Sequence, residues 1–339
     1  MTSILYVGRQ TGTSGHRLAA LRRLGFDVTL ADPYAILPSN KLVRAWAYKS
    51  GALGLEGIVY AFLDTFLKGK SFDAALVDNG ELLSARSVRR IRDAAKAVGV
   101  FNQDNPFTQR DGFRWRLLRK ALPTYDIYIT PRLSNVAQGY EVGARNVLRV
   151  WFSADEIAHK SRAINPRDDL PFTAAVSFVG TWMPERGPFM LKLIESGVPL
   201  KIFGARWSRD PNYDKLAPFV AGGELLGDDY AATIATSKVS LALLSQGNAD
   251  LHTTRSLEIP TIGGLLLGKR TTEHLCLYRE GEEAVFWDDA EECAEACMKL
   301  LQHDDLRQSI AAAGQIRALS NNHYNERWLS EMVQALTQA

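Results

Sequence analysis

The sequence has few cysteines, almost no net charge and no long apolar run. Its three cysteines, Cys276, Cys293 and Cys297, are too few for a disulfide framework, so we expect a reducing compartment. Lys and Arg number 40 against 38 Asp and Glu, which leaves a net charge of +2. Because nucleic-acid-binding domains normally carry a strong basic excess, we expect no nucleic-acid partner.

Segments that would insert into a membrane are also lacking. Residues 1–8 (MTSILYVG) have no basic start and no long apolar core, so they predict a first β-strand and not a signal peptide. The most apolar helix-length stretch, 51–67, is interrupted by Glu56 and Asp64 and is shorter than the roughly 20 residues of a bilayer span. We expect a cytoplasmic protein whose membrane contact is at most peripheral, at the inner face of the membrane.

What is present is an ordinary globular composition, 46% hydrophobic and 23% charged, in a chain of 339 residues that predicts two domains. In the first half, short apolar runs alternate with helical patterns, which predicts an α/β domain with a parallel sheet. The expected strands are 4–7, 27–30, 74–77, 100–102, 127–130 and 147–150, and the expected helices are 16–24, 88–98 and one ending at 138.

The alternation restarts after a polar stretch with two prolines, 161–171, which predicts a linker. The expected strands are then 176–179, 200–203, 239–244 and 265–267, and the expected helices are 188–196, 230–237, 256–262, 291–302, 305–319 and 321–338. We therefore predict an N-terminal domain over 1–160, a C-terminal domain over 171–319 and a final helix over 320–339. Two such domains place ligands at the carboxyl ends of their strands.

The strongest local signal is the segment 250–264 (DLHTTRSLEIPTIGG), where a polar loop leads into a helix. Thr254, Arg255 and Ser256 lie near the helix start, where free N–H groups and the helix dipole favour a diphosphate. Arg255 adds a fork of donors suited to phosphate oxygens. Glu258, expected in the first turn, has a carboxylate able to accept paired hydrogen bonds from ribose hydroxyls. A capped helix with a favourable acidic residue explains the same pattern equally well.

Segment 255–267 (RSLEIPTIGGLLL), together with 271–275 and 283–289, resembles the C-terminal domain of the spore-maturation-protein-like (CgeB-like) glycosyltransferases of the group 1 set. Weaker similarities follow at 128–132, 143–147, 151–155, 178–181 and 202–207. The resemblance covers most of the chain from about residue 101 and is most specific over 255–264. It implies an α/β chain of the GT-B fold, with two Rossmann-like domains facing each other across a cleft and a C-terminal helix returning to the N-terminal domain.

The resemblance also implies a donor site. Glu258 would bind the donor ribose. Many retaining members of the wider group carry two glutamates separated by seven residues, and here Asp250 stands where the first glutamate would be. The contact of Asp250 with the donor sugar and the stereochemical outcome, retaining or inverting, are therefore open.

Further donor contacts are implied in the loops after the first two strands of the C-terminal domain. These residues are Gly180, Thr181, Arg186, Phe203, Gly204 and Trp207. Gly180 and Thr181 would approach the phosphates or the acceptor side. Gly204 would let the backbone pass close to the nucleotide base, with Phe203 or Trp207 nearby.

Two residues of the N-terminal domain are candidate catalytic groups. His16 follows a loop whose glycines, at 8, 12 and 15, do not match the dinucleotide pattern; it would orient an acceptor or act as a base, or is an ordinary first-turn histidine. Asp104 follows a strand end and is placed for the general base of an inverting transferase. Its neighbours, Asn105 and Pro106, also make good turn chemistry.

Metal ligands are not expected. Cys293 and Cys297 fit one helix face without further ligands nearby, and the histidines are scattered. The Asp-x-Asp arrangement by which other transferases hold a divalent cation does not occur. The acids form adjacent pairs at 168–169, 228–229, 288–289 and 304–305, whose side chains would diverge in a strand.

The sequence thus predicts a metal-independent glycosyltransferase without a cofactor, whose substrates are a nucleotide-sugar donor and a glycan, lipid-linked or protein acceptor. A nucleotide-sugar epimerase and a non-catalytic GT-B partner subunit are the alternatives. The basic segment 110–120 would rest on anionic lipid or hold an anionic acceptor, unless it is a solvated face.

Overall fold

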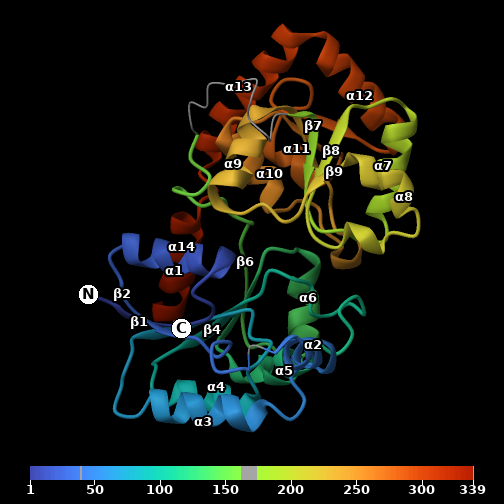
Figure 1. Cartoon of the computed structure of the whole chain (residues 1–339). Coiled ribbons are helices and arrows are strands. Elements are labelled where there is room, and N and C mark those ends of the chain that lie inside the picture. The colour runs from blue at the N-terminus through green and yellow to red at the C-terminus, as the bar shows by residue number, and fades with distance from the viewer. Residues whose placement is uncertain (39, 162–173, 339) are drawn as a thin grey trace. The chain divides into compact units, whose positions relative to one another are not determined.

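The computed structural model describes residues 1–38, 40–161 and 174–338, and it divides the chain into two compact units (Figure 1). Unit 1 comprises Met1–Phe152 and Tyr324–Ala339, and unit 2 comprises Ser153–His323. Apart from Ser161, the predicted linker 161–171 lies outside the described residues. No helix in the described ranges is both long and apolar enough to cross a membrane.

Unit 1 contains a parallel six-stranded sheet in the order β2-β1-β3-β4-β5-β6. Its strands are β1 (Ser3–Val7), β2 (Asp27–Ala31), β3 (Ala74–Asp78), β4 (Val98–Phe101), β5 (Ile127–Thr130) and β6 (Val147–Arg149). Each strand predicted for the first half is confirmed, with small shifts at the ends. The apolar runs were informative because a parallel sheet is covered on both faces, so its strands are apolar throughout.

Helices cover both faces of this sheet. They are α1 (Gly12–Arg23), α2 (Lys41–Ser50), α3 (Glu56–Phe66), α4 (Ala85–Arg92), α5 (Arg116–Ala121), α6 (Ser134–Glu141) and α14 (Asn325–Gln338). Alternate residues of β1 enter different cores, because successive side chains of a strand point to opposite faces. Ile4 and Tyr6 belong to the core formed with α1 and α14, whereas Leu5 and Val7 belong to the core formed with α3, α4 and α5.

The C-terminal helix α14 returns to unit 1 and packs beside α1, as predicted (Figure 1). The expected helix over 88–98 is right only in its first part: α4 ends at Arg92, and Val98 and Gly99 lie in β4. A Cβ at this position would lie 2.8 Å from Leu336 Cδ2 of α14, so a larger residue there would require the Leu336 side chain to shift. The side chain that β4 lacks makes room for the last helix.

Unit 2 repeats the pattern with a parallel sheet in the order β12-β11-β10-β7-β8-β9. Its strands are β7 (Ala174–Val179), β8 (Leu200–Phe203), β9 (Val220–Gly222), β10 (Ser237–Ala242), β11 (Leu266–Lys269) and β12 (Val285–Trp287). Its helices are α7 (Arg186–Glu195), α8 (Tyr213–Leu216), α9 (Gly227–Thr236), α10 (Thr254–Ile262), α11 (Thr272–Leu277), α12 (Ala290–Gln302) and α13 (Asp304–Asn321). Cys293 and Cys297 are buried on α12 in its core.

The α14 packing predicts a stability effect within unit 1. Leu336→Ala, at a side chain that is 1% exposed, should lower the free energy of unfolding by about 2–5 kcal/mol through the lost contacts and the cavity left behind. Gln334→Ala, on the exposed side of the same helix, is the matched control and should change little. Urea unfolding followed by tryptophan fluorescence checks this. Equal midpoints for both variants would mean that α14 does not complete the core.

Candidate functional site

The strand order of unit 2 reverses between β7 and β10, and ligands of open α/β sheets bind at such reversals. Arg186, 8% exposed, connects the two strand ends here. Its Nη1 donates to the carbonyl of Thr181 at 2.7 Å and its Nη2 to the carbonyl of Leu243 at 3.2 Å. Because both contacts are to backbone, Arg186 fixes the loops around the predicted donor site, and a contact with the donor itself stays a prediction.

The loops after β7 and β8 touch at two glycines. Gly204 has a φ of +147°, and a Cβ on it would lie 2.0 Å from the carbonyl oxygen of Gly180. Trp207 donates its Nε1–H to the same oxygen at 3.0 Å and is 2% exposed, as is Phe203. The two aromatic side chains therefore fill the core, and their predicted place beside a nucleotide base stays untested.

The N-terminus of α10 is capped by side chains. Thr253 Oγ1 accepts from the N–H of Arg255 at 3.0 Å, and Ser256 Oγ accepts from the N–H of Thr253 at 3.0 Å. This reciprocal cap starts the helix at Thr254, two residues before the predicted start. Glu258 is therefore in the second turn and not, as expected, in the first.

A buried hydrogen-bond chain holds this cap. His274 Nδ1 lies 2.6 Å from the carbonyl oxygen of Lys269, which can only accept, so Nδ1 carries the hydrogen. His274 Nε2, 2.6 Å from Ser256 Oγ, then accepts from the hydroxyl. Burial lowers the pKa of His274 to about 4, so the ring is neutral near pH 7. Ser256 is fully buried within these hydrogen bonds. Its hydroxyl is therefore not exposed for the predicted contact with the donor.

Arg255 is the partly exposed cation of the site. Its Nε donates to the carbonyl of Val179, the last residue of β7, at 3.2 Å, and its Nη1 donates to Glu258 Oε2. The guanidinium carbon lies 4.3 Å from the centre of the Tyr230 ring. The Arg255 side chain keeps 31% of its surface exposed, so a firmly held guanidinium still faces solvent where the sheet order reverses.

Glu258 is hidden behind it, with 3% exposure. Its Oε2 also accepts from the Tyr230 hydroxyl at 2.9 Å, and its Oε1 lies 3.6 Å from His159 Nε2. Burial alone would raise the pKa of Glu258, but Arg255, His159 and the Tyr230 hydrogen bond outweigh it and hold the pKa below its usual range. The carboxylate is thus ionised and surrounded by protein groups.

His159 and Tyr230 were missed by the sequence analysis. The Asp155 N–H donates to His159 Nδ1 at 2.9 Å, so Nε2 is the nitrogen that carries a hydrogen beside Glu258. The two rings meet edge to face at 5.9 Å. Residues 159, 230 and 258 are far apart in sequence, and the one hint was the segment 151–155, which ends at Asp155 and belongs to the resemblance.

Two of the predicted donor residues, Arg186 and Asp250, line a cavity of about 740 Å³. It lies within unit 2 at the carboxyl ends of β10, β11 and β12, where Lys269 and Trp287 also line it. Its position at strand ends is the one expected for a ligand of an open α/β sheet. The contact of Asp250 with a sugar stays a prediction.

The two candidate catalytic residues come from separate elements of unit 1. His16 lies in the second turn of α1, which begins at Gly12 and not, as expected, at His16. Asp104 follows β4, and its Oδ2 accepts from Arg114 Nη1 at 3.1 Å. Since β3 lies between β1 and β4, the helix that carries His16 and the loop that carries Asp104 follow strands that are not adjacent in the sheet. Their catalytic roles stay predictions.

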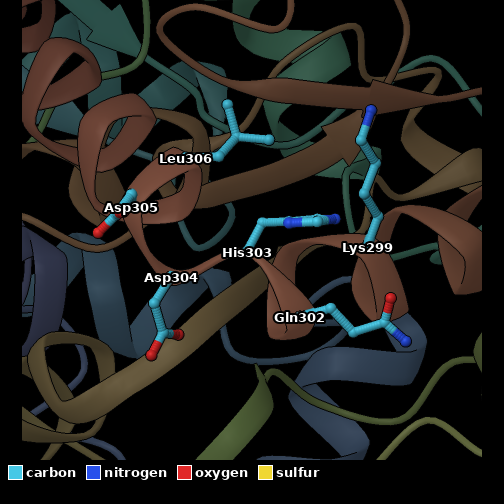
Figure 2. A pocket seen from close by; sticks show the side chains of 6 residues that line it. All are labelled: Lys299, Gln302, His303, Asp304, Asp305 and Leu306. Atoms are coloured by element: carbon cyan, nitrogen blue, oxygen red, sulfur yellow. The ribbon is translucent and has the colours of Figure 1, made fainter.

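A smaller cavity of about 500 Å³ lies where α12 ends and α13 begins (Figure 2). Of its two acidic residues, Asp304 pairs with Arg307 at 2.8 Å and with Lys238 at 3.5 Å. It is lined by helix residues and not by strand ends, so it is no candidate for the donor site.

The described residues contain no group of three or more His, Cys, Asp or Glu side chains arranged to hold a metal ion. The adjacent acids in the described residues lie at or next to helix starts and not in strands: Asp228 and Asp229 lie in the first turn of α9, Asp289 caps α12, and Asp304 and Asp305 begin α13. Acids favour helix N-termini because the dipole attracts them. The pair 168–169 lies outside the described residues.

Comparisons with known proteins agree with this architecture. Residues 186–334 match the family described as glycosyl transferase-like. Sucrose-phosphate synthase of Thermosynechococcus elongatus is similar in structure, with a TM-score of 0.69 and 12% identity over 100% of this chain and 99% of that one. HepE of Anabaena, solved with UDP and glucose, has a TM-score of 0.65 and 13% identity over 99% and 100%. The BGT protein of phage T4, solved with its UDP-glucose substrate, has a TM-score of 0.59 and 12% identity over 98% of both chains.

No curated protein matches the sequence significantly. At these identities the structural likenesses establish the fold alone. Together with the two Rossmann-like sheets they confirm the GT-B fold that the resemblance implied.

The buried His274 predicts a pH dependence of stability. Its folded pKa, about 4, lies below the value near 6.5 of an exposed histidine, so protons bind the unfolded chain first. The contribution of His274 is complete above about pH 6.5 and is lost as the pH falls toward 4, by at most about 3 kcal/mol. Urea unfolding across this range should show a shallower slope for His274→Gln than for wild type. The exposed control His303→Gln should keep the wild-type slope, and identical slopes for all three proteins would refute the assignment.

Proposed function

We propose that this protein is a glycosyltransferase that takes a sugar from a nucleoside-diphosphate sugar, with a UDP-sugar as the first donor to test. The carrying observation is the partly exposed Arg255, held beside the capped N-terminus of α10 at the strand-order reversal of unit 2. The glycosyl transferase-like match over 186–334 includes both. The UDP complexes of HepE and the UDP-glucose complex of the phage T4 protein support the choice of nucleotide.

Sugar transfer leaves a nucleoside diphosphate, and the site must stabilise the charge that develops on it. In the proposed mechanism the guanidinium of Arg255 binds the diphosphate and the dipole at the N-terminus of α10 adds to the attraction, since the Arg255 and Ser256 N–H groups are already bonded within the cap. Glu258, Tyr230 and the Val179 carbonyl hold Arg255 before the donor arrives, so little reorganisation is needed in the reaction.

The ribose would bind at Glu258. One carboxylate oxygen already holds Arg255 and Tyr230, so the ribose hydroxyls would meet the other, Oε1, whose contact with His159 is long at 3.6 Å. Thr254, Gly180, Thr181 and Gly204 would complete the donor contacts through backbone and hydroxyl groups, and Asp250 would meet the sugar.

On the acceptor side we propose Asp104 as the general base and His16 as a group that orients the acceptor. A general base that activates the acceptor for direct attack gives inversion at the anomeric carbon, so the stereochemistry of the product tests Asp104. The acceptor would be a glycan, a lipid-linked sugar or a protein, and the enzyme would belong to the CgeB-like branch. This rests on the segment 255–267 and its neighbours.

Two substitutions test the donor site by isothermal titration calorimetry with UDP and with pyrophosphate. Arg255→Lys should weaken both ligands by the same factor, at least about tenfold, because a point charge cannot replace a fork of donors. Glu258→Gln should weaken UDP more than pyrophosphate, because it removes the ribose contact as well as the partner of Arg255.

The paired ligands separate the two roles of Glu258. Equal losses for UDP and pyrophosphate in Glu258→Gln would leave it as a positioning residue for Arg255. Tyr230→Phe is the matched control, since it keeps the ring beneath Arg255 and removes one hydrogen bond to Glu258. Undiminished affinity in Arg255→Lys and Glu258→Gln would exclude this site. Conversion of UDP-glucose to an epimer without acceptor would favour the epimerase alternative.

Metal removal is the second test. If the helix N-terminus and Arg255 neutralise the leaving diphosphate, donor turnover should survive excess EDTA. Partial loss restored by magnesium would indicate a cation recruited by the diphosphate itself. Complete loss that magnesium reverses would contradict the proposed mechanism.

A further inference from the structure

Helix α2 of unit 1 exposes most of its side chains. Ala47 is its buried residue, while Leu42 is 77% exposed, Trp46 54% and Tyr48 42%. A helix packed only on a domain core would turn its large apolar residues inward. Here Leu42 and Trp46, one turn apart, face solvent together.

More exposed apolar side chains adjoin this helix. Leu53 and Phe113 are 53% and 67% exposed. Trp46 donates its Nε1–H to the Leu53 carbonyl at 3.0 Å, and a Cβ on Gly51 would lie 2.1 Å from the Phe113 carbonyl oxygen. Figure 1 shows α2 close to α5, which follows Phe113 in the chain. We call Leu42, Trp46, Tyr48, Leu53 and Phe113 the α2 surface.

Helix α2 also carries unpaired positive charge beside the α2 surface. Lys41, Arg44 and Lys49 are exposed, α2 contains no acidic residue, and none of the three has an ion-pair partner within the described part of the chain. The basic segment 110–120, for which lipid, an anionic acceptor and a solvated face were all open, differs in that two of its arginines are paired. Arg114 pairs with Glu81 and Asp104, and Arg116 pairs with Glu56 at 2.6 Å.

We propose that the α2 surface docks on an anionic lipid bilayer. Trp46 and Leu42 would enter the boundary between headgroups and acyl chains, and the three cations would meet lipid phosphates. Exposed apolar groups alone would fit a protein partner as well. The three unpaired cations on the same helix favour a uniformly negative surface. The proposal is independent of the donor-site assignments, because it uses none of those residues.

Cosedimentation of the whole protein with vesicles tests the proposal. The protein should bind vesicles of phosphatidylcholine with phosphatidylglycerol, bind phosphatidylcholine vesicles much less, and be released by salt. The triple variant Lys41→Gln/Arg44→Gln/Lys49→Gln should lower the partition coefficient about 100-fold, since each basic residue near the surface contributes several-fold. Leu42→Ser/Trp46→Ser should lower it on both kinds of vesicle.

The matched control is Lys68→Gln/Lys215→Gln/Lys299→Gln, which removes the same charge from exposed positions on other elements and should bind like wild type. Equal loss in the control triple would show a net-charge effect and overturn the proposal. So would absent binding to phosphatidylglycerol vesicles at low salt, or wild-type binding by both α2 variants. Sedimentation velocity tests whether a second copy of the chain covers the surface instead. Self-association that Leu42→Ser/Trp46→Ser abolishes, in a protein that does not bind vesicles, would assign the surface to that second copy. The charge variant alters only exposed side chains, so it remains interpretable if the apolar variant fails to fold.

Discussion

The site in unit 2 depends on one buried cation, Arg186, at the point where the strand order reverses. Backbone carbonyls after β7 and β10 accept from the two terminal nitrogens of this buried guanidinium, which lowers the cost of burying its charge. This contact fixes the ends of the two strands relative to each other. The carbonyl of Val179 that accepts from Arg255, and Gly180 that lies against Gly204, belong to the strand end that Arg186 joins to the end of β10. The partly exposed Arg255 therefore contacts the backbone at one of these two strand ends.

Unit 1 has an arginine at its own reversal of strand order, between β1 and β3, but there the guanidinium is buried in an ion pair. Arg17 and Asp78 are each 4% exposed and joined by bonds of 2.8 and 3.0 Å, with the Tyr6 hydroxyl also on Asp78. In unit 2 the carboxylate of Glu258 is buried while Arg255 remains partly open. An ion pair in which both partners are buried is a structural contact. A cation that is bonded to a buried carboxylate but still partly exposed can bind a further anion. This difference is why we place the diphosphate in unit 2.

The sequence predicted all six strands of unit 1 and four of the six strands of unit 2, because strands covered on both faces are apolar runs. The two three-residue strands β9 and β12 were not predicted. The helix ends were less predictable. The cap that starts α10 at Thr254 depends on His274 and Lys269, which are distant in sequence. Gly99 lies in β4 and does not mark the end of α4, which is at Arg92. Arg255 and Glu258 could be found from one segment, but His159 and Tyr230 could not, because only the folded chain brings them together.

The return of α14 to unit 1 has a consequence for biosynthesis. Unit 2 is one continuous stretch, Ser153–His323, and is inserted between the two pieces of unit 1. As the ribosome works from the N-terminus, the first 152 residues emerge early but lack Trp328, Leu329 and Leu336, which complete one of their two cores. While all of unit 2 is translated, the nascent unit 1 therefore keeps exposed the part of this sheet face that α14 covers, with α1 packed on the face. The part of the chain that is synthesised first is therefore the last to complete its core. Until α14 has been synthesised, it is the part most exposed to aggregation and most in need of a chaperone.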